Sequence, residues 1–300
     1  MIDCHIHISL DGIDFKKARE NGKREEIFDI IRKTLKEYRK RGIYVLRDGG
    51  DNLEISCTAR KIAKEEGIIL KSPVKALYKK GMYGNFLGEE LEDLYDFKKI
   101  FKYLKIKQLD HLKIILSGLV NFKKYKDVGE LQFTQKELKY IVDLAKDSNI
   151  PTMAHVNSPY GVNMAVECGI DTIEHGYFIT QRELYKMKEK DTIWIPTLSP
   201  LGNLVINKDK RFEENIDVIK RVYEEHLSSV NLAYEMGVKM AVGSDSGCYG
   251  VTHVDGTFDE INHLVKAGIK KEEVIRMGIE NGIKVCNLSE SEKEYLNYLQ

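Results

Sequence analysis

Two histidines separated by a single residue, His5 and His7, stand in the opening stretch MIDCHIHISL. Because alternate side chains of a β-strand point to the same face, this spacing places both imidazoles on one face, together with Asp3. The opposite face is expected to carry Ile2, Cys4, Ile6 and Ile8. Neutral imidazole is the commonest metal ligand among protein side chains. The pattern therefore indicates a strand with a packing face and a metal-binding face, although two structural histidines explain the pair alone equally well.

Three later segments also end in a side chain that can bind a metal. His155 closes TMAH, His175 closes DTIEH, and Asp245 closes KMAVGSD. A single histidine at a strand end is usually structural, but two on consecutive strands, facing a His-x-His pair, are hard to explain without a metal. In the last segment, strand alternation directs Asp245 to the same side as the small residues Ala241 and Gly243, which leave room for an ion and a water.

Lys113 alternates with apolar residues in HLKIILSG and is expected to face inward. An ammonium group without a partner is costly to bury, so something must pair with it or neutralise it. One explanation is an ion pair with a neighbouring carboxylate. The other is carboxylation by carbon dioxide, which turns the amine into an anionic ligand able to bridge two metals.

The elements that position these side chains alternate in type along the chain. We predict strands near residues 2–8, 43–48, 67–74, 111–117, 150–156, 170–175, 192–197 and 238–245, with amphipathic helices between them. Eight strand–helix units predict a parallel sheet closed into a (β/α)8 TIM barrel. An open doubly wound sheet is the alternative, but no G-x-G-x-x-G turn follows the first strand. In such barrels, the site forms at the carboxyl ends of the strands.

Composition narrows the class of protein. The chain has 300 residues, with 47 Lys and Arg against 47 Asp and Glu, and this balance does not favour nucleic acid or an anionic membrane as partner. No apolar run approaches the roughly 20 residues of a membrane span, and no signal peptide opens the chain. The five scattered cysteines suit a reducing compartment. We expect a cytoplasmic protein with a small-molecule substrate; the sequence does not decide between a monomer and a homo-oligomer.

In these motifs the chain resembles the amidohydrolase superfamily of metal-dependent hydrolases. The matching segments follow the family order along nearly the whole chain: DCHIH, GIYVLRDGG, HLKIILSG, AHVN, IEHG and GSDSG. The phrases IEHGYF and IPTLSP are most similar to the branch that contains imidazolonepropionase-related and prolidase-like enzymes. Many members carry an accessory β-sandwich. Since the first strand begins at Ile2, we expect a single barrel domain over residues 1–300 without that sandwich.

The resemblance implies a binuclear metal centre. One divalent metal is held by His5, His7 and Asp245, and a second by His155 and His175. Carboxylated Lys113 bridges the two, with carbon dioxide as the source of the added carboxyl group. Zinc is the first candidate because it accepts imidazole ligands, and manganese, cobalt or iron suits the same donors.

A hydrolase acting on carbon–nitrogen bonds follows from this centre. Bound metal lowers the pKa of water to about 7, and a hydroxide that bridges two metals can attack an amide, peptide-like or cyclic amide bond. Asp245 then moves the proton to the leaving group, with His175 at the substrate oxygen. One alternative is a lactonase or phosphotriesterase, which uses the same binuclear core. Another is a deaminase, but deaminases of this superfamily generally have one metal and no bridging lysine, so Lys113 counts against that function. A non-catalytic binding barrel is disfavoured because the sequence retains a metal-ligating residue at each of the five strand ends.

The loops after the strands supply the candidate substrate contacts. His253 follows the eighth strand in GCYGVTHVDG and is a candidate contact, although a structural role explains it equally well. Tyr83 lies in LYKKGMYGNFLGEE, which is either an aromatic lid or a solvated turn. Arg47 ends the second strand and either touches substrate or forms an ion pair at the rim.

Overall fold

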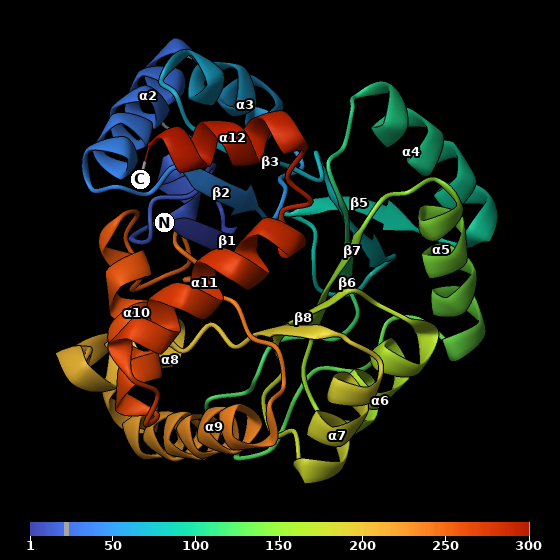
Figure 1. The fold of residues 1–300 in the computed structure, drawn as a ribbon. Helices are drawn as coiled ribbons and strands as arrows, with labels where there is room; N and C mark the ends of the chain where they lie inside the picture. Colours follow the sequence, from blue (N-terminus) through green and yellow to red (C-terminus); the bar gives the residue numbers. More distant parts are fainter. Residues whose placement is uncertain (21–23, 300) are drawn as a thin grey trace.

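The computed structural model describes residues 1–20 and 24–299 and shows helices arranged around parallel strands (Figure 1). The strands are β1 Ile2–Ile6, β2 Val45–Asp48, β3 Ile69–Lys71, β4 Ala76–Lys79, β5 Gly88–Leu91, β6 Leu112–Ile115, β7 Thr152–Val156, β8 Thr172–His175 and β9 Ile193–Ile195. The helices are α1 Phe15–Glu20, α2 Arg24–Lys40, α3 Ile55–Glu65, α4 Leu94–Ile106, α5 Gln135–Asp147, α6 Pro159–Cys168, α7 Gln181–Glu189, α8 Ser199–Asn207, the 3-10 helix η1 Lys210–Asn215, α9 Ile216–Met236, α10 Asp255–Lys266, α11 Lys271–Val285 and α12 Glu290–Tyr298. This alternation confirms the predicted α/β fold with parallel sheets, and the arrangement is TIM-barrel-like.

The strands form two parallel sheets, in the orders β1-β2-β3 and β5-β4-β6-β7-β8-β9. The segment 239–246 lies between them, where the sequence predicts the last strand. The Trp194 N–H of β9 donates to Lys239 O at 2.9 Å, and the Cys4 N–H of β1 donates to Val242 O at 2.8 Å. This segment therefore connects β9 to β1 by backbone hydrogen bonds without being a regular strand.

Strands β4 and β5 lie in a stretch that the sequence analysis treats as a loop. They pair in parallel, from Ala76 beside Gly88 to Lys79 beside Leu91. A Cβ atom on Gly88 would lie only 1.7 Å from Ala76 O, so this close approach requires glycine. Each strand has four residues and β5 contains two glutamates, which leaves little hydrophobic alternation to detect.

The predicted alternation fails at the start of β1. Register between β1 and β2 shifts between Asp3 and Ile6, as at a β-bulge. Asp3 does not share the face of His5: its Oδ2 accepts hydrogen bonds from Ser244 Oγ and from Thr257 Oγ1 of α10, both at 2.6 Å. Cys4 instead packs in the cluster that includes Ile195 and Ala241. The extra residue of a bulge reverses the faces on one side of it, which the period of two cannot anticipate.

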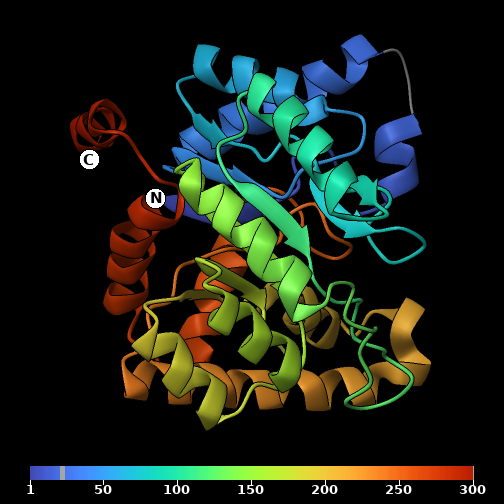
Figure 2. The ribbon, with the colours of Figure 1, turned by 90° about the vertical axis from the view of Figure 1, so that its right-hand side faces the viewer.

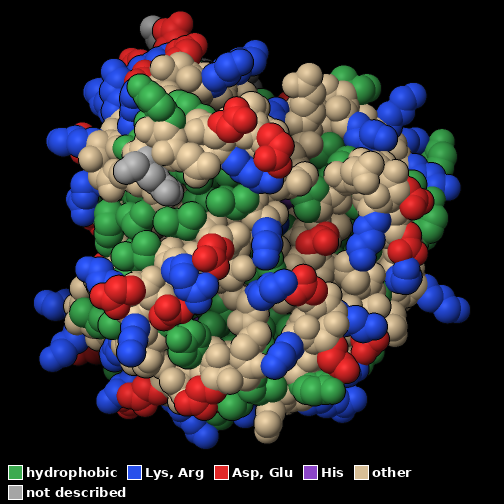
Figure 3. All heavy atoms as spheres, viewed as in Figure 1, with side chains coloured by type: hydrophobic (Ala, Val, Ile, Leu, Met, Phe, Trp, Pro, Cys, Tyr) green, Lys and Arg blue, Asp and Glu red, His purple; other side chains and the backbone are tan. Residues whose placement is uncertain are grey.

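The two ends of the strands differ in what covers them. In Figure 2, α11 and α12 lie at one end, and the loops after the strands lie at the other. The α12 face bears Lys and Arg side chains interspersed with Asp and Glu, in keeping with the balanced composition (Figure 3). Among the described residues, no helix is both long and apolar enough to cross a membrane.

Candidate metal centre

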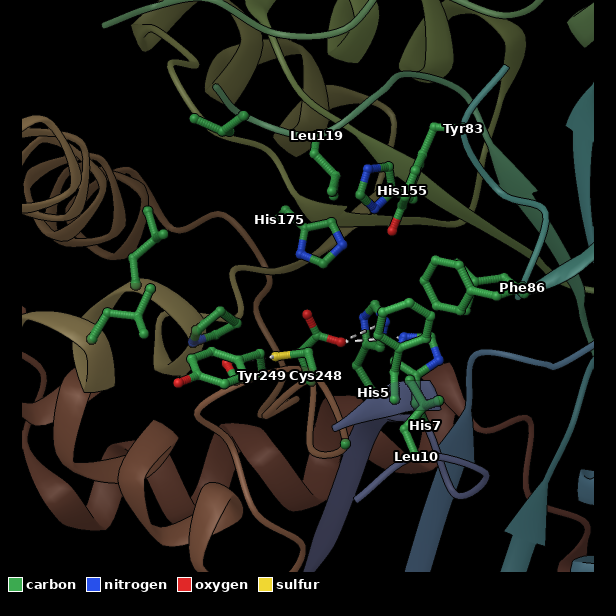
Figure 4. Close-up of a pocket in the computed structure, with 18 of the residues that line it drawn as sticks. His5, His7, Leu10, Tyr83, Phe86, Leu119, His155, His175, Cys248 and Tyr249 are labelled. Atoms are coloured by element: carbon green, nitrogen blue, oxygen red, sulfur yellow. Dashed lines mark hydrogen bonds and ion pairs between the residues drawn. The ribbon is translucent and has the colours of Figure 1, made fainter. Parts of the chain in front are cut away.

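One cavity of about 940 Å³ opens at the carboxyl ends of the strands. All six residues that the sequence analysis selects as metal ligands line it: His5, His7, Lys113, His155, His175 and Asp245. They come from β1 and the residue after its end, β6, β7, β8 and the segment after β9, and Figure 4 shows the four histidines turned toward a common space. Tertiary structure thus brings together side chains that run from His5 to Asp245 along the sequence.

His5, His7 and Asp245 form the tightest group in the cavity. One ligand atom from each lies within 4.8 Å of the others. Asp245 Oδ1 is 3.2 Å from His7 Nε2 and 3.7 Å from His5 Nε2. His5 Nε2 is buried, and it has no hydrogen-bond partner within the described part of the chain. Such an atom is costly to leave without a partner, so its placement fits a metal ligand.

His155 and His175 form a second group beside the first. Their ring centroids are 4.5 Å apart, and that of His175 lies 5.2 Å from the ring of His5. His175 Nδ1 is held by Thr197 Oγ1 at 2.7 Å, which leaves Nε2 as the ring nitrogen available to a ligand. His155 Nε2 is also buried, and residues 1–20 and 24–299 offer it no hydrogen-bond partner. This pair therefore offers two further lone-pair donors.

Lys113 lies in β6, where Ile115 pairs with His155 of β7. Its side chain is buried, with 1% of the residue exposed. Among the described residues, no carboxylate oxygen lies within 4.0 Å of its Nζ, so the ion-pair explanation finds no partner. Burial lowers the pKa of Lys113 to about 8, against the opposing effect of Glu174 and Asp245.

Burial also sets the charge of the imidazoles. It lowers the pKa of His155 to about 3, with Lys113 adding to the effect, and it holds the pKa values of His5 and His175 well below their usual range. Burial opposes ionisation of Asp245, but His5, His7 and Lys113 bring its pKa below the usual value. Neutral imidazoles with buried unpartnered nitrogens, beside an ionised carboxylate, are a donor set that fits a divalent cation.

Three residues at this edge adopt left-handed backbone conformations. The φ angles are 65° at His175, 49° at Thr197 and 59° at Asp245. Such conformations are uncommon outside glycine, and they cluster at functional sites. Regular alternation in β8 would turn only one of Glu174 and His175 inward. The positive φ at His175 breaks this alternation, so both side chains can face the site. Glu174 and His175 both contact site residues, through His5 and Thr197 respectively.

Glu174 is a site residue that the sequence analysis missed. Its Oε2 lies 2.7 Å from His5 Nδ1, and its Oε1 accepts from Arg47 at 3.2 Å and from Thr172 at 2.6 Å. All of these side chains are buried. Its position just before His175 in IEHG, on the face of Thr172, is the signal that could have revealed it.

Of the three candidate substrate contacts, the cavity lining includes Tyr83 but not Arg47 or His253. Tyr83 lines the cavity, with its ring centroid 5.7 Å from that of His155. Arg47 is fully buried against Glu174 and is not among the cavity-lining residues. His253 also lies outside the lining, because Tyr38 Oη at 3.0 Å and Leu10 O at 2.8 Å occupy its two ring nitrogens.

Comparison with known proteins identifies the family. The model of the amidohydrolase family matches residues 1–291, almost the whole chain. The chain belongs to the amidohydrolase family. Among curated relatives of this amidohydrolase, ochratoxinase of Aspergillus niger is 28% identical over 148 residues, which are 49% of the chain and 31% of the ochratoxinase. A protein of Mycobacterium tuberculosis is 28% identical over 155 residues, 50% of the chain and 41% of that protein. The matched segments thus span less than half of these relatives.

Solved structures resemble the amidohydrolase over almost its whole length. A Xaa-Pro dipeptidase with bound methionine has a TM-score of 0.79 at 21% identity, covering 96% of this chain and 75% of that one. The A. niger ochratoxinase structure has a TM-score of 0.77 at 19% identity, covering 95% and 71%. At these identities the likeness establishes a shared fold.

Proposed function

We propose that this amidohydrolase hydrolyses a carbon–nitrogen bond of a small-molecule amide, peptide-like or cyclic amide substrate. The observation that carries the proposal is the convergence of His5, His7 and Asp245 with His155 and His175 in one cavity. Three buried ring nitrogens of this group have no hydrogen-bond partner among the residues described: His5 Nε2, His7 Nδ1 and His155 Nε2. A cavity of about 940 Å³ is also of the size that accommodates small molecules, roughly 300–1,000 Å³.

The proposal includes two divalent metals. His5, His7 and Asp245 would hold one, and His155 and His175 the other. When bound, such metals supply a nucleophile from water at neutral pH and polarise the substrate carbonyl. Carboxylated Lys113 would provide an anionic bridge, since its Nζ is buried in the cavity without an ion-pair partner among the described residues. Zinc is the first candidate metal.

Asp245 is the proposed proton carrier. Its carboxylate is ionised in this environment and lies at the edge of the cavity, so it can accept a proton at its second oxygen and deliver it to the leaving nitrogen. His175, whose ring is held by Thr197, would contact the substrate carbonyl oxygen. Tyr83 adds an aromatic wall on the side of His155.

We also propose that the strands close into a barrel. Backbone hydrogen bonds from Trp194 and Cys4 to the segment 239–246 support closure between β9 and β1. On the other side, the Asp110 N–H before β6 donates to Ser72 O after β3 at 2.9 Å. A closed sheet leaves no free edge near the metal ligands, which would hold them rigidly.

Metal analysis followed by a hydrolysis screen tests the function. The purified protein should contain about two metal ions per chain and hydrolyse members of a panel of N-acyl amino acids, Xaa-Pro dipeptides, imidazolones and lactones. Chelation should abolish the activity, and added zinc should restore it. About one metal per chain with release of ammonia from an amine-bearing ring would point to deamination, and activity on lactones alone would exclude an amidase.

A further inference from the structure

Arg211 presents a cation to the cavity from η1. Its guanidinium lies 4.5 Å from the centroid of the Tyr249 ring. The Tyr249 hydroxyl donates to Asp209 Oδ2 at 2.9 Å, and Asp209 Oδ1 accepts from the backbone N–H of Arg211 at 2.9 Å. Arg211 and Tyr249 both line the cavity. Stacking orients the guanidinium, and its donors have no hydrogen-bond acceptor among the residues that the structure describes.

Arg211 makes no ion pair with the carboxylates of residues 1–20 and 24–299. Asp209, which is next to it in sequence, is engaged instead by Tyr249 and by the backbone. Guanidinium is the side-chain group best suited to two-point binding of a carboxylate, because its N–H donors form a planar fork. An oriented and unneutralised arginine on a cavity wall is therefore a binding element for an anion.

The wall that carries Arg211 continues to the candidate metal centre. The Cys248 N–H donates to Asp245 O at 3.0 Å, and Tyr249 follows directly. Figure 4 shows Cys248 and Tyr249 on one side of the space that His5 and His175 border. A molecule with its amide at Asp245 would thus have Tyr249 and Arg211 along the same wall.

The rest of the cavity is mostly apolar. Aromatic and aliphatic side chains line it, among them Phe86, Leu119, Phe122, Leu201, Leu204 and Phe212. Apolar lining residues are also open to solvent, among them Ile13, which is 67% exposed, Leu119, which is 54% exposed, and Phe15, which is 50% exposed. Exposed apolar surface gathered at a cavity marks a ligand-binding region.

We propose that the cavity selects N-acyl amino acids: amides with a carboxylate on the amine side, bound by Arg211, and a bulky apolar acyl group packed against the apolar lining. The proposal rests on the amide hydrolysis proposed above for its chemical step. Recognition itself depends only on Arg211 and the apolar lining, so binding and turnover can be tested separately.

The test compares two probes that differ only in the carboxylate: N-benzoyl-L-phenylalanine and N-(2-phenylethyl)benzamide. Calorimetry on chelator-treated protein should show the acid binding at least about tenfold more tightly, as expected for a charge-assisted contact. Arg211→Gln should remove most of this preference. Arg221→Gln is the matched control, since its guanidinium also stacks on a tyrosine, 3.5 Å from the Tyr125 ring centroid, outside the cavity lining.

Turnover by the metal-loaded enzyme separates this inference from the proposed function. The acid should be hydrolysed with the higher kcat/KM, and Arg211→Gln should act chiefly on KM. Acid binding that depends on Arg211 without hydrolysis supports the recognition inference and counts against amide hydrolysis of this class. Equal binding of the two probes by the wild type, including no measurable binding of either, overturns the inference. A preference that survives in Arg211→Gln also overturns it.

Discussion

His5 Nδ1 lies 2.7 Å from Glu174 Oε2, and both side chains are completely buried. This contact fixes the orientation of the imidazole and directs Nε2 toward Asp245. Glu174 is in turn held by Arg47, whose guanidinium lies 3.2 Å from Oε1. A carboxylate behind a histidine ligand is a common way to orient the ring and raise its basicity.

Replacing Glu174 should therefore weaken metal binding without removing a ligand. We expect Glu174→Gln to lower metal affinity about 10- to 100-fold, measured by competition with a chelator of known affinity. Glu183→Gln is the control, because Glu183 is also buried but caps α7 away from the cavity. Equal metal affinity in wild type and Glu174→Gln would show that the contact does not support the metal centre.

Lys113 should be carboxylated in the metal-loaded protein. Protein prepared with 13C-labelled bicarbonate should give a carbamate carbon signal that Lys113→Ala lacks, and this variant should also lose metal. Lys71→Ala serves as the control, since Lys71 pairs with Glu292 at 2.7 Å and does not line the cavity. An unmodified Lys113 in a crystal structure with two bound metals would contradict the prediction, and one with a single metal would favour a deaminase.

Substitution of Asp245 should have a different effect from substitution of His5 or His7. Asp245→Asn removes the proton acceptor but keeps an oxygen near the metal, so kcat should fall about 100-fold or more while part of the metal remains. His5→Ala and His7→Ala should lose metal and activity together. If Asp245→Asn with bound metal works at close to the parent rate, another residue carries the proton.

Stability should fall in acid because of buried histidines such as His226. Its Nε2 lies 2.8 Å from Pro196 O, and burial lowers its pKa to about 4. An unfolded histidine has a pKa of about 6.5, so the unfolded chain binds the proton first as the pH falls. The contribution is complete above about pH 6.5, and roughly 2 kcal/mol of unfolding free energy is lost by about pH 5.

Urea unfolding in the presence of chelator, at about pH 7.5 and about pH 5, measures this effect. His226→Gln should reduce the difference between the two free energies by roughly 2 kcal/mol. Tyr177→Phe is the control and should keep the full difference in free energy. The ring centroids of Tyr177 and His226 are 4.3 Å apart, but the Tyr177 side chain does not titrate in this pH range. The same difference in His226→Gln and wild type would refute the assignment.

Local pattern was sufficient for the α/β fold and for six of the residues that line the cavity. The reason is that a strand end can be recognised from alternation and a following glycine or polar residue, and the ends of parallel strands meet at one edge. His5, Lys113 and Asp245 therefore share a cavity that could be anticipated from types and spacing alone. The short strands β4 and β5 escaped because they carry too little alternation.

Tertiary structure alone decided how the side chains are oriented. Asp3 turns toward Ser244 and Thr257 because a register shift reverses the faces of β1. At His175 the backbone turns to a positive φ, and its carbonyl accepts from Trp194 Nε1 of the next strand at 2.9 Å.

The positions of three further side chains also depended on the tertiary structure. Partners far away in the sequence hold Arg47 and His253, and Arg211 lies in the short 3-10 helix η1. Arg47 forms an ion pair with Glu174, and the ring nitrogens of His253 contact Tyr38 Oη and Leu10 O. Arg211 lines the cavity, where its guanidinium stacks on Tyr249. The sequence by itself therefore determined which chemistry the chain carries, through residue types at strand ends. Which side chains face the cavity depended on bulges, φ angles and long-range contacts, because these are fixed only when distant segments pack.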